Sequence, residues 1–140
     1  MLGALGSATE VGISLADTIK GRHVYIVDGD GSFFFNPNQL VDLAALKPKN
    51  LTVICLDNGS YGSTGNQPTL SSSGMNLSAW VQTLGVETSA ITDQSDTFSE
   101  LIKEKPTFIH YLIKAGNEKS GEEIPLKAVE IKQRFMDAII

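Results

Sequence analysis

Short apolar runs alternate with amphipathic segments along this chain of 140 residues. Runs rich in β-branched and aromatic residues predict buried strands over 23–27, 51–56 and 106–113, and a weaker strand over 86–91. Segments with apolar residues at helical spacing predict helices over 7–20, 36–46, 76–84, 93–103 and 126–139. Asn36 is the expected N-cap of the second helix, with Pro37 at its first helical position, and Asn76 is the expected cap of the third.

This alternation predicts an α/β fold, a three-layer sandwich with a mostly parallel central sheet and helices on both faces. The length suits a single domain over residues 1–140. Parallel sheets of this kind bind ligands beyond the carboxyl ends of their strands. The polar segment 58–74 follows the second strand, and a loop of that length is typically functional or disordered. Residues 116–123 read as a polar linker.

Composition narrows the function classes. The formal net charge of -5 disfavours nucleic acid as a partner. A lone cysteine, Cys55, excludes an internal disulfide and is expected in the core. No apolar stretch is long enough to span a membrane, and the N-terminus lacks the basic start of a signal peptide, so we expect a cytoplasmic protein.

Polar residues that suit a phosphate ligand follow the first two strands. Gly29, Asp30, Gly31 and Ser32 end the first strand, and Asn58 follows the second after an interval that fits a helical crossover. If the two strands are neighbours, Asp30 and Asn58 lie side by side at one edge of the sheet. The glycines would let backbone N–H groups approach an anion closely.

A dinucleotide site is the obvious alternative, but Phe34 occupies the place of its third glycine, and Asp30 would repel a bare diphosphate. A magnesium ion removes that conflict, because Mg²⁺ joins protein oxygens to phosphate oxygens. Asp30, the Asn58 side chain and a backbone carbonyl at Ser60 are the expected ligands. The alternative reading is a glycine-rich turn and an unrelated asparagine turn, since both residue types are common in turns.

The Gly29-Asp30-Gly31-Ser32 segment with Asn58 resembles the cofactor motif of the thiamine-diphosphate-dependent decarboxylases. Residues 3–6, Gly-Ala-Leu-Gly, resemble the segment that shapes the cofactor there. The resemblance implies that Leu5 is the wedge under the bent cofactor and that the backbone of Gly3 and Leu5 contacts the aminopyrimidine. It also implies that Ser32 binds the diphosphate and that Ser60 and Tyr61 contact the cofactor.

Segments 46–51, 57–67, 124–126 and 131–135 resemble the branch formed by sulfopyruvate decarboxylase β subunits, with phosphonopyruvate decarboxylases as near relatives. Those β subunits extend further toward the N-terminus, which suggests a truncated start. Relatives often have Ser and Met where this chain has Ala4 and Leu5. The implied reaction converts sulfopyruvate to sulfoacetaldehyde and carbon dioxide, a step of coenzyme M biosynthesis. Phosphonopyruvate decarboxylation is the alternative.

In that family the activating glutamate lies on a separate pyrimidine-binding domain. The resemblance therefore implies an α-type partner subunit, a chain that is inactive alone, and self-association of the complex. Ser63, Thr64 and Gln67 follow the expected metal ligands and are candidates for a loop that closes over substrate. A flexible surface turn is the competing interpretation of that loop.

Three further functions remain open on the sequence alone. A carboligase or oxidoreductase subunit would use the same domain, although iron–sulfur enzymes of that type often carry more cysteines. A non-catalytic assembly subunit would bind cofactor without turnover, and a dinucleotide module remains the weakest option. His110 is expected to be structural, His23 to be at the surface, and Trp80 to pack in the core or an interface.

Overall fold

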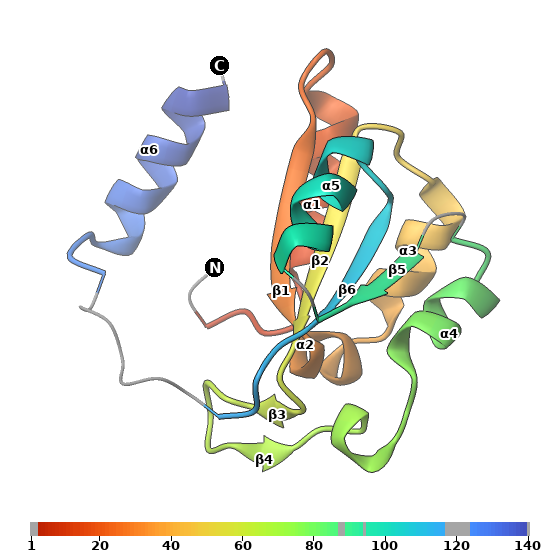
Figure 1. The fold of residues 1–140 in the computed structure, drawn as a ribbon. Helices are drawn as coiled ribbons and strands as arrows, with labels where there is room; N and C mark the ends of the chain where they lie inside the picture. The colour runs from red at the N-terminus through yellow and green to blue at the C-terminus, as the bar shows by residue number, and fades with distance from the viewer. Residues whose placement is uncertain (1–2, 87–88, 94, 117–123, 140) are drawn as a thin grey trace.

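The computed structural model describes residues 3–86, 89–93, 95–116 and 124–139. A four-stranded parallel sheet forms its centre, as Figure 1 shows, with the strand order β1-β2-β6-β5. These strands are β1 (Val24–Gly29), β2 (Leu51–Asp57), β5 (Ser89–Thr92) and β6 (Phe108–Leu112). The predicted α/β class and the parallel sheet are confirmed. β1 pairs directly with β2, so the ends of the two motif-bearing strands are neighbours.

Six helices lie along the described chain: α1 (Ala8–Thr18), α2 (Asp30–Phe35), α3 (Asn38–Leu46), α4 (Leu77–Thr83), α5 (Ser95–Glu104) and α6 (Ala128–Ile139). Five match the predicted segments within a few residues. The sixth, α2, was not predicted as a separate helix. It begins at Asp30, within the glycine motif, and ends one residue before Asn36.

The core is densest around β2, where five successive residues from Leu51 to Cys55 are buried. Because successive strand residues point to opposite faces, both faces of β2 are covered. Gly12 of α1 permits close packing on the sheet, since a Cβ there would lie 2.3 Å from Cγ1 of Ile26. One face of β1 is open instead, with Tyr25 42% and Val27 58% exposed.

The long polar segment after β2 is ordered into short elements. β3 (Ser60–Tyr61) pairs antiparallel with β4 (Gln67–Pro68), and the 3₁₀ turn η1 (Ser71–Ser73) follows. Gly59, with φ of +69°, makes the turn that leads into this hairpin. The hairpin lies beside α2, below the carboxyl ends of the strands in Figure 1.

The two predicted asparagine caps have different outcomes. Asn76 caps α4, because its side-chain oxygen accepts from the Ala79 N–H at 3.0 Å. The prediction for Asn36 was wrong by one residue, because Pro37, expected at the first helical position, is the N-cap of α3. Asn36 ends α2, and its side-chain nitrogen donates to the carbonyl of Gly6 at 2.7 Å and to Glu10 at 3.2 Å. Because α2 ends at Phe35, Asn36 follows the last turn of that helix and is its C-cap.

The last helix, α6, lies apart from the sheet, and none of its described residues is buried. Its C-terminal end is held by a hydrogen bond from the Arg22 guanidinium to the carbonyl of Ala138 at 2.9 Å. Most of the predicted linker over 116–123 lies outside the described residues. In the part of the chain that the structure describes, no helix is both long and apolar enough to cross a bilayer.

Candidate functional site at the carboxyl end of the sheet

A cavity of about 570 Å³ lies beyond the carboxyl ends of β1 and β2. The topology explains its position, because parallel neighbours bring the two polar strand ends to one edge. Eight residues predicted to contact the cofactor or metal line it: Leu5, Gly29, Asp30, Gly31, Ser32, Asn58, Ser60 and Tyr61. Its other lining residues are Val27, Asp28, Leu56, Gly62, Ser63 and Ile113.

Asp30 is the most unusual residue of this cavity. Its side chain is buried, with the residue 1% exposed, although it begins a helix. Oδ2 accepts a hydrogen bond of 2.5 Å from the Thr69 hydroxyl, whereas Oδ1 is buried and accepts none. The hydroxyl of Ser60 is likewise buried without a partner. Buried polar atoms are nearly always hydrogen-bonded. Of the four buried side-chain oxygens that lack a partner in the described part of the chain, these are the two that line this cavity, so they mark where a ligand could bind.

Burial raises the pKa of Asp30, and the charge of nearby Asp57 adds to the rise. The Thr69 hydroxyl opposes it, as do the backbone N–H groups of Asn58 and Gly31, which lie near the carboxylate but do not satisfy Oδ1. Burial would also raise the pKa of Asp57, but hydrogen bonds from His110, Ser71 and Gly59 outweigh it and lower that pKa. A divalent cation at Asp30 would favour its ionised form and relieve the repulsion between the two carboxylates.

The loop after β2 brings Asn58 and Ser60 to the cavity. The side-chain oxygen of Asn58 accepts from the Ser60 N–H at 3.0 Å, which closes a tight turn. An amide oxygen has a second lone pair, so this bond leaves Asn58 able to accept a cation. Asp30 and Asn58 therefore share one cavity, as the sequence predicted.

The two motif glycines differ in what surrounds them. A Cβ on Gly31 would lie 2.6 Å from the ring of Tyr61, so any larger residue there would force that ring to move. A Cβ on Gly29 would meet nothing closer than the Leu56 carbonyl at 3.9 Å. The protein alone has room for a side chain at Gly29, which leaves an open surface for close ligand approach.

The N-terminal segment reaches the same cavity through Leu5, which is 38% exposed. Ser32 holds this segment, because its hydroxyl accepts from the Gly6 N–H at 3.0 Å and donates to Asp28 at 2.5 Å. A bond from Ser32 to a diphosphate would require the bond to Asp28 to break, and that role stays a prediction. Gly3 is exposed and does not line the cavity.

The predicted substrate loop is divided. Ser63 lines the cavity next to Tyr61. Thr64 and Gln67 do not line it, and their side chains contact each other at 3.2 Å across the exposed hairpin. The loop is thus neither wholly a free surface turn nor wholly part of the cavity wall.

Sequence reasoning missed the residues behind the cavity. Asp57 and Thr69 had no assigned role, and His110 was expected only to be structural. His110 is buried and bonds Asp57. The position of Asp57 beside Asn58 was a usable signal, whereas nothing in the sequence links Thr69 to Asp30.

Two aromatic predictions have clear outcomes elsewhere in the fold. His23, expected at the surface, is half-buried, and its Nε2 lies 2.9 Å from the Thr52 hydroxyl. Trp80 stacks on Phe34 with ring centroids 6.3 Å apart, which confirms a packing role.

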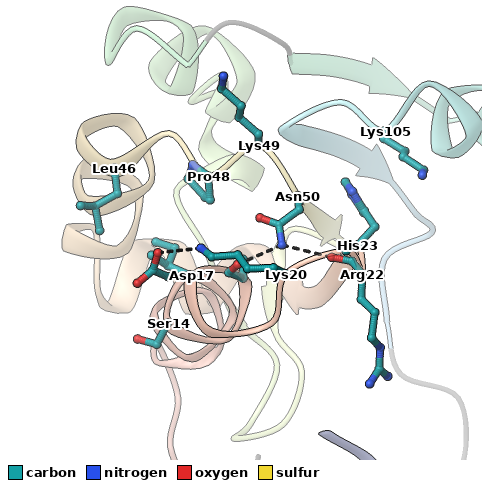
Figure 2. A pocket seen from close by; sticks show the side chains of 13 residues that line it. Ser14, Asp17, Lys20, Arg22, His23, Leu46, Pro48, Lys49, Asn50 and Lys105 are labelled. Carbon is teal, nitrogen blue, oxygen red and sulfur yellow. Dashed lines mark hydrogen bonds and ion pairs between the residues drawn. The ribbon is translucent and has the colours of Figure 1, made fainter.

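A larger cavity, of about 830 Å³, lies at the opposite end of the sheet. Figure 2 shows basic side chains around it, with Lys20 paired to Asp17 at 3.1 Å and Asn50 bound to backbone carbonyls. Among the described residues, none that lines it has a buried polar side-chain atom without a partner. Size alone would favour this cavity as the ligand site. The buried oxygens of Asp30 and Ser60 that lack hydrogen-bond partners favour the smaller cavity instead.

The donor set at the carboxyl end suits a hard cation shared with a ligand. Within the described ranges, no three acidic, histidine or cysteine side chains are grouped to hold a metal by themselves. One carboxylate, one amide and a backbone carbonyl leave coordination positions for phosphate oxygens, which is how Mg²⁺ commonly binds. The unpartnered Oδ1 of Asp30 is the observation that fits this ion.

Residues 1–111 match the family model of the thiamine pyrophosphate enzyme C-terminal TPP-binding domain. The chain is 37% identical over 145 residues to the sulfopyruvate decarboxylase subunit beta of Methanocaldococcus jannaschii, covering 99% of this chain and 75% of that protein. It is 33% identical over 144 residues to the sulfopyruvate decarboxylase of Methanosarcina acetivorans, covering 99% and 37% respectively. The phosphonopyruvate decarboxylase of Streptomyces viridochromogenes is 35% identical over 140 residues, covering 96% and 35%.

The fold also matches a solved structure. A candidate thiamin diphosphate-dependent enzyme from Mycobacterium smegmatis superimposes with a TM-score of 0.64 at 21% sequence identity, over 83% of this chain and 23% of that one. This chain therefore spans about three quarters of the β subunit but little more than a third of the longer decarboxylases.

Proposed function

Because the chain belongs to the thiamine pyrophosphate enzymes as their C-terminal TPP-binding domain, we propose that it supplies the diphosphate and magnesium half of a 2-oxoacid decarboxylase site. One observation carries this proposal: Oδ1 of Asp30 is buried without a partner in the cavity that Asn58 and Ser60 share. An unpaired buried carboxylate oxygen is costly, and a bound cation removes that cost.

The residues divide the work between cation and diphosphate. Asp30, the Asn58 side chain and the backbone carbonyl of Ser60 would hold Mg²⁺. Gly29 and Gly31 would let the backbone approach the diphosphate, and Ser32 and Tyr61 would stand beside it. Residues 1–140 act in this proposal as one domain.

Thiamine diphosphate, when bound, supplies the electron sink that decarboxylation of a 2-oxoacid requires. The chain's own contribution is position and surroundings. Leu5, Val27 and Ile113 give the cavity an apolar wall, which would exclude water from the reacting end of the ligand. Leu5 would also support the bent shape of the cofactor as a wedge.

A second chain would complete the site. No glutamate lines the cavity among the described residues, so the activating acid would come from an α-type subunit with a pyrimidine-binding domain. Three relatives support this division, since they are named as beta subunits. Val27 lines the cavity and Tyr25 lies on the same open face of β1, so these exposed residues suit an interface that would cover this face and complete the three-layer sandwich. The complex would self-associate.

The proposed substrate is sulfopyruvate, which would give sulfoacetaldehyde and carbon dioxide for coenzyme M biosynthesis. Names of relatives at 30–37% identity support it. Phosphonopyruvate is the second candidate, supported by two relatives named for that substrate at 34–35% identity. Both acids carry a strongly anionic group next to the keto acid.

Calorimetry on this chain mixed with an α-type partner tests the proposal. We expect thiamine diphosphate to bind only when both magnesium and the partner are present. Carbon dioxide release from sulfopyruvate, phosphonopyruvate and pyruvate then ranks the substrates. Binding without turnover of any 2-oxoacid would favour a non-catalytic subunit, and absence of binding would refute the site.

A further inference from the structure

A buried chain of hydrogen bonds lies behind the cavity, and the proposed ligand roles do not use it. Asp57, 4% exposed, ends β2 and stands at its centre. Its carboxylate lies 2.7 Å from Nε2 of His110, accepts a bond from the Ser71 hydroxyl, and accepts the Gly59 N–H at 2.9 Å. Three bonds from three different segments fix the orientation of this carboxylate.

The chain of bonds extends in both directions. On the core side, Nδ1 of His110 lies 3.1 Å from the hydroxyl of Ser78 in α4. On the cavity side, the Gly59 carbonyl accepts the Thr69 N–H at 3.0 Å. Thr69 then donates its hydroxyl to Oδ2 of Asp30 at 2.5 Å. The network therefore connects the buried centre of β6 and α4 to the proposed metal ligand.

These bonds set the geometry that a cation would meet. Because Thr69 occupies Oδ2 of Asp30, the remaining oxygen, Oδ1, is left for a ligand. Because Asp57 holds the Gly59 N–H, the turn that carries Asn58 and Ser60 is fixed at its centre. Both halves of the ligand set are thus oriented by the same buried residues.

Resting on the proposed function, we propose that Thr69, Asp57 and His110 are positioning residues that preset Asp30 and Asn58 for the magnesium–diphosphate ligand. They contact neither cation nor cofactor. Residues that orient metal ligands in this way typically change metal affinity by about 10- to 100-fold when they are replaced.

The sharpest test removes the Thr69 hydroxyl without changing the side-chain shape. Thr69→Val is compared with Thr69→Ser, which keeps the hydroxyl, and with Thr52→Val as a matched control. Thr52 is equally buried and donates to the Pro106 carbonyl at 2.6 Å, but it lies near the other end of the sheet. Calorimetry on the complex with its partner gives the apparent magnesium affinity at fixed thiamine diphosphate, and thermal unfolding without metal gives stability.

We expect Thr69→Val to weaken apparent magnesium affinity by at least tenfold, with cofactor binding restored at high magnesium. Thr69→Ser should lie within about threefold of the unmodified chain, and Thr52→Val should lose stability without losing magnesium affinity. These expectations follow from the usual effect of residues that orient metal ligands. Equal magnesium affinity in Thr69→Val and the unmodified complex would overturn the inference.

A second variant keeps the test decisive if Thr69→Val does not fold. Ser71→Ala removes the bond to Asp57 at a partly exposed position, and Ser14→Ala removes an exposed hydroxyl from α1 as its control. We expect weaker magnesium affinity only in Ser71→Ala, and unchanged affinity there would contradict the role of Asp57. If the unmodified complex shows no magnesium-dependent binding, the proposed function fails first and this inference with it.

Discussion

The two ends of the parallel sheet carry opposite charges: exposed basic residues at the amino end and buried acidic residues at the carboxyl end. At the amino end, each of β1, β2 and β6 is preceded by two exposed basic residues: Lys20 and Arg22, Lys47 and Lys49, and Lys103 and Lys105. Helices α1, α3 and α5 end there, and their last carbonyls favour cations. Helix dipoles and solvent therefore stabilise the basic charges at this end without a ligand.

At the carboxyl end, the charges are buried acids. Asp57 lies close enough to raise the pKa of Asp30, and only Asp57 has both carboxylate oxygens hydrogen-bonded. Helix dipoles do not satisfy a buried oxygen that lacks a donor. Unmet hydrogen bonds in a cavity, rather than its size or total charge, therefore indicate where a ligand binds.

Of all the substitutions at the two ends of the sheet, replacing Asp30 should have the largest effect. Asp30→Asn keeps the shape and the acceptor for Thr69, but removes the charge that a cation needs. We expect magnesium-dependent cofactor binding to fall by more than about 100-fold, measured by calorimetry. Unchanged affinity would rule out Asp30 as a ligand.

The pH dependence of the free energy of unfolding gives a second test of Asp30→Asn. The pKa of Asp30 is raised above its ordinary value of 3.8, so the unfolded chain loses this proton at lower pH. Stability of the metal-free protein should therefore fall as pH rises from 3.8 through the folded pKa. Urea unfolding across this range should show a smaller fall in Asp30→Asn.

Two glycine variants separate protein packing from ligand approach. Gly31→Ala should destabilise the protein by about 1–3 kcal/mol, because the Tyr61 ring must move. Gly29→Ala should change stability by less than about 0.5 kcal/mol and yet weaken cofactor binding about tenfold. Thermal unfolding and calorimetry on both variants measure this. Full affinity in Gly29→Ala would show that no ligand approaches the backbone there.

The apolar wall should matter for rate more than for affinity. Leu5→Ala shortens a partly exposed side chain, so stability should hold within about 0.5 kcal/mol. We expect kcat to fall about tenfold, equivalent to about 1.4 kcal/mol, with a smaller change in cofactor affinity. Steady-state kinetics with the partner subunit measure both. A loss confined to affinity would contradict the wedge role.

The smallest effect is expected at the amino end. Lys49→Gln with Lys105→Gln removes two exposed charges from the larger cavity. Cofactor binding should not change, and stability should change by less than about 1 kcal/mol. The same calorimetric assay checks this. A clear loss of cofactor binding would mean that the two ends of the sheet are coupled.

The location of the site could be predicted because it depends on topology. Once β1 and β2 are parallel neighbours, Asp30 and Asn58 must meet at one edge. The bond between Thr69 and Asp30 could not be predicted, since it spans 39 residues and depends on how the hairpin folds back. Helix α2 was missed because its six residues are too few to show a helical period. Asn36 was misassigned for the same reason.

The reactivity of Cys55 toward a thiol reagent can report how often the central strand opens. It is the single thiol of the chain, fully buried in the middle of β2, and burial together with the charges of Asp57, Asp30 and Asp28 raises its pKa. A thiol reagent reaches it only when β2 leaves the sheet, so the labelling rate reports opening of the central strand. A ligand that binds only the closed state would slow labelling by the factor 1 + [L]/Kd. Cofactor occupancy could thus be followed without any assay of turnover.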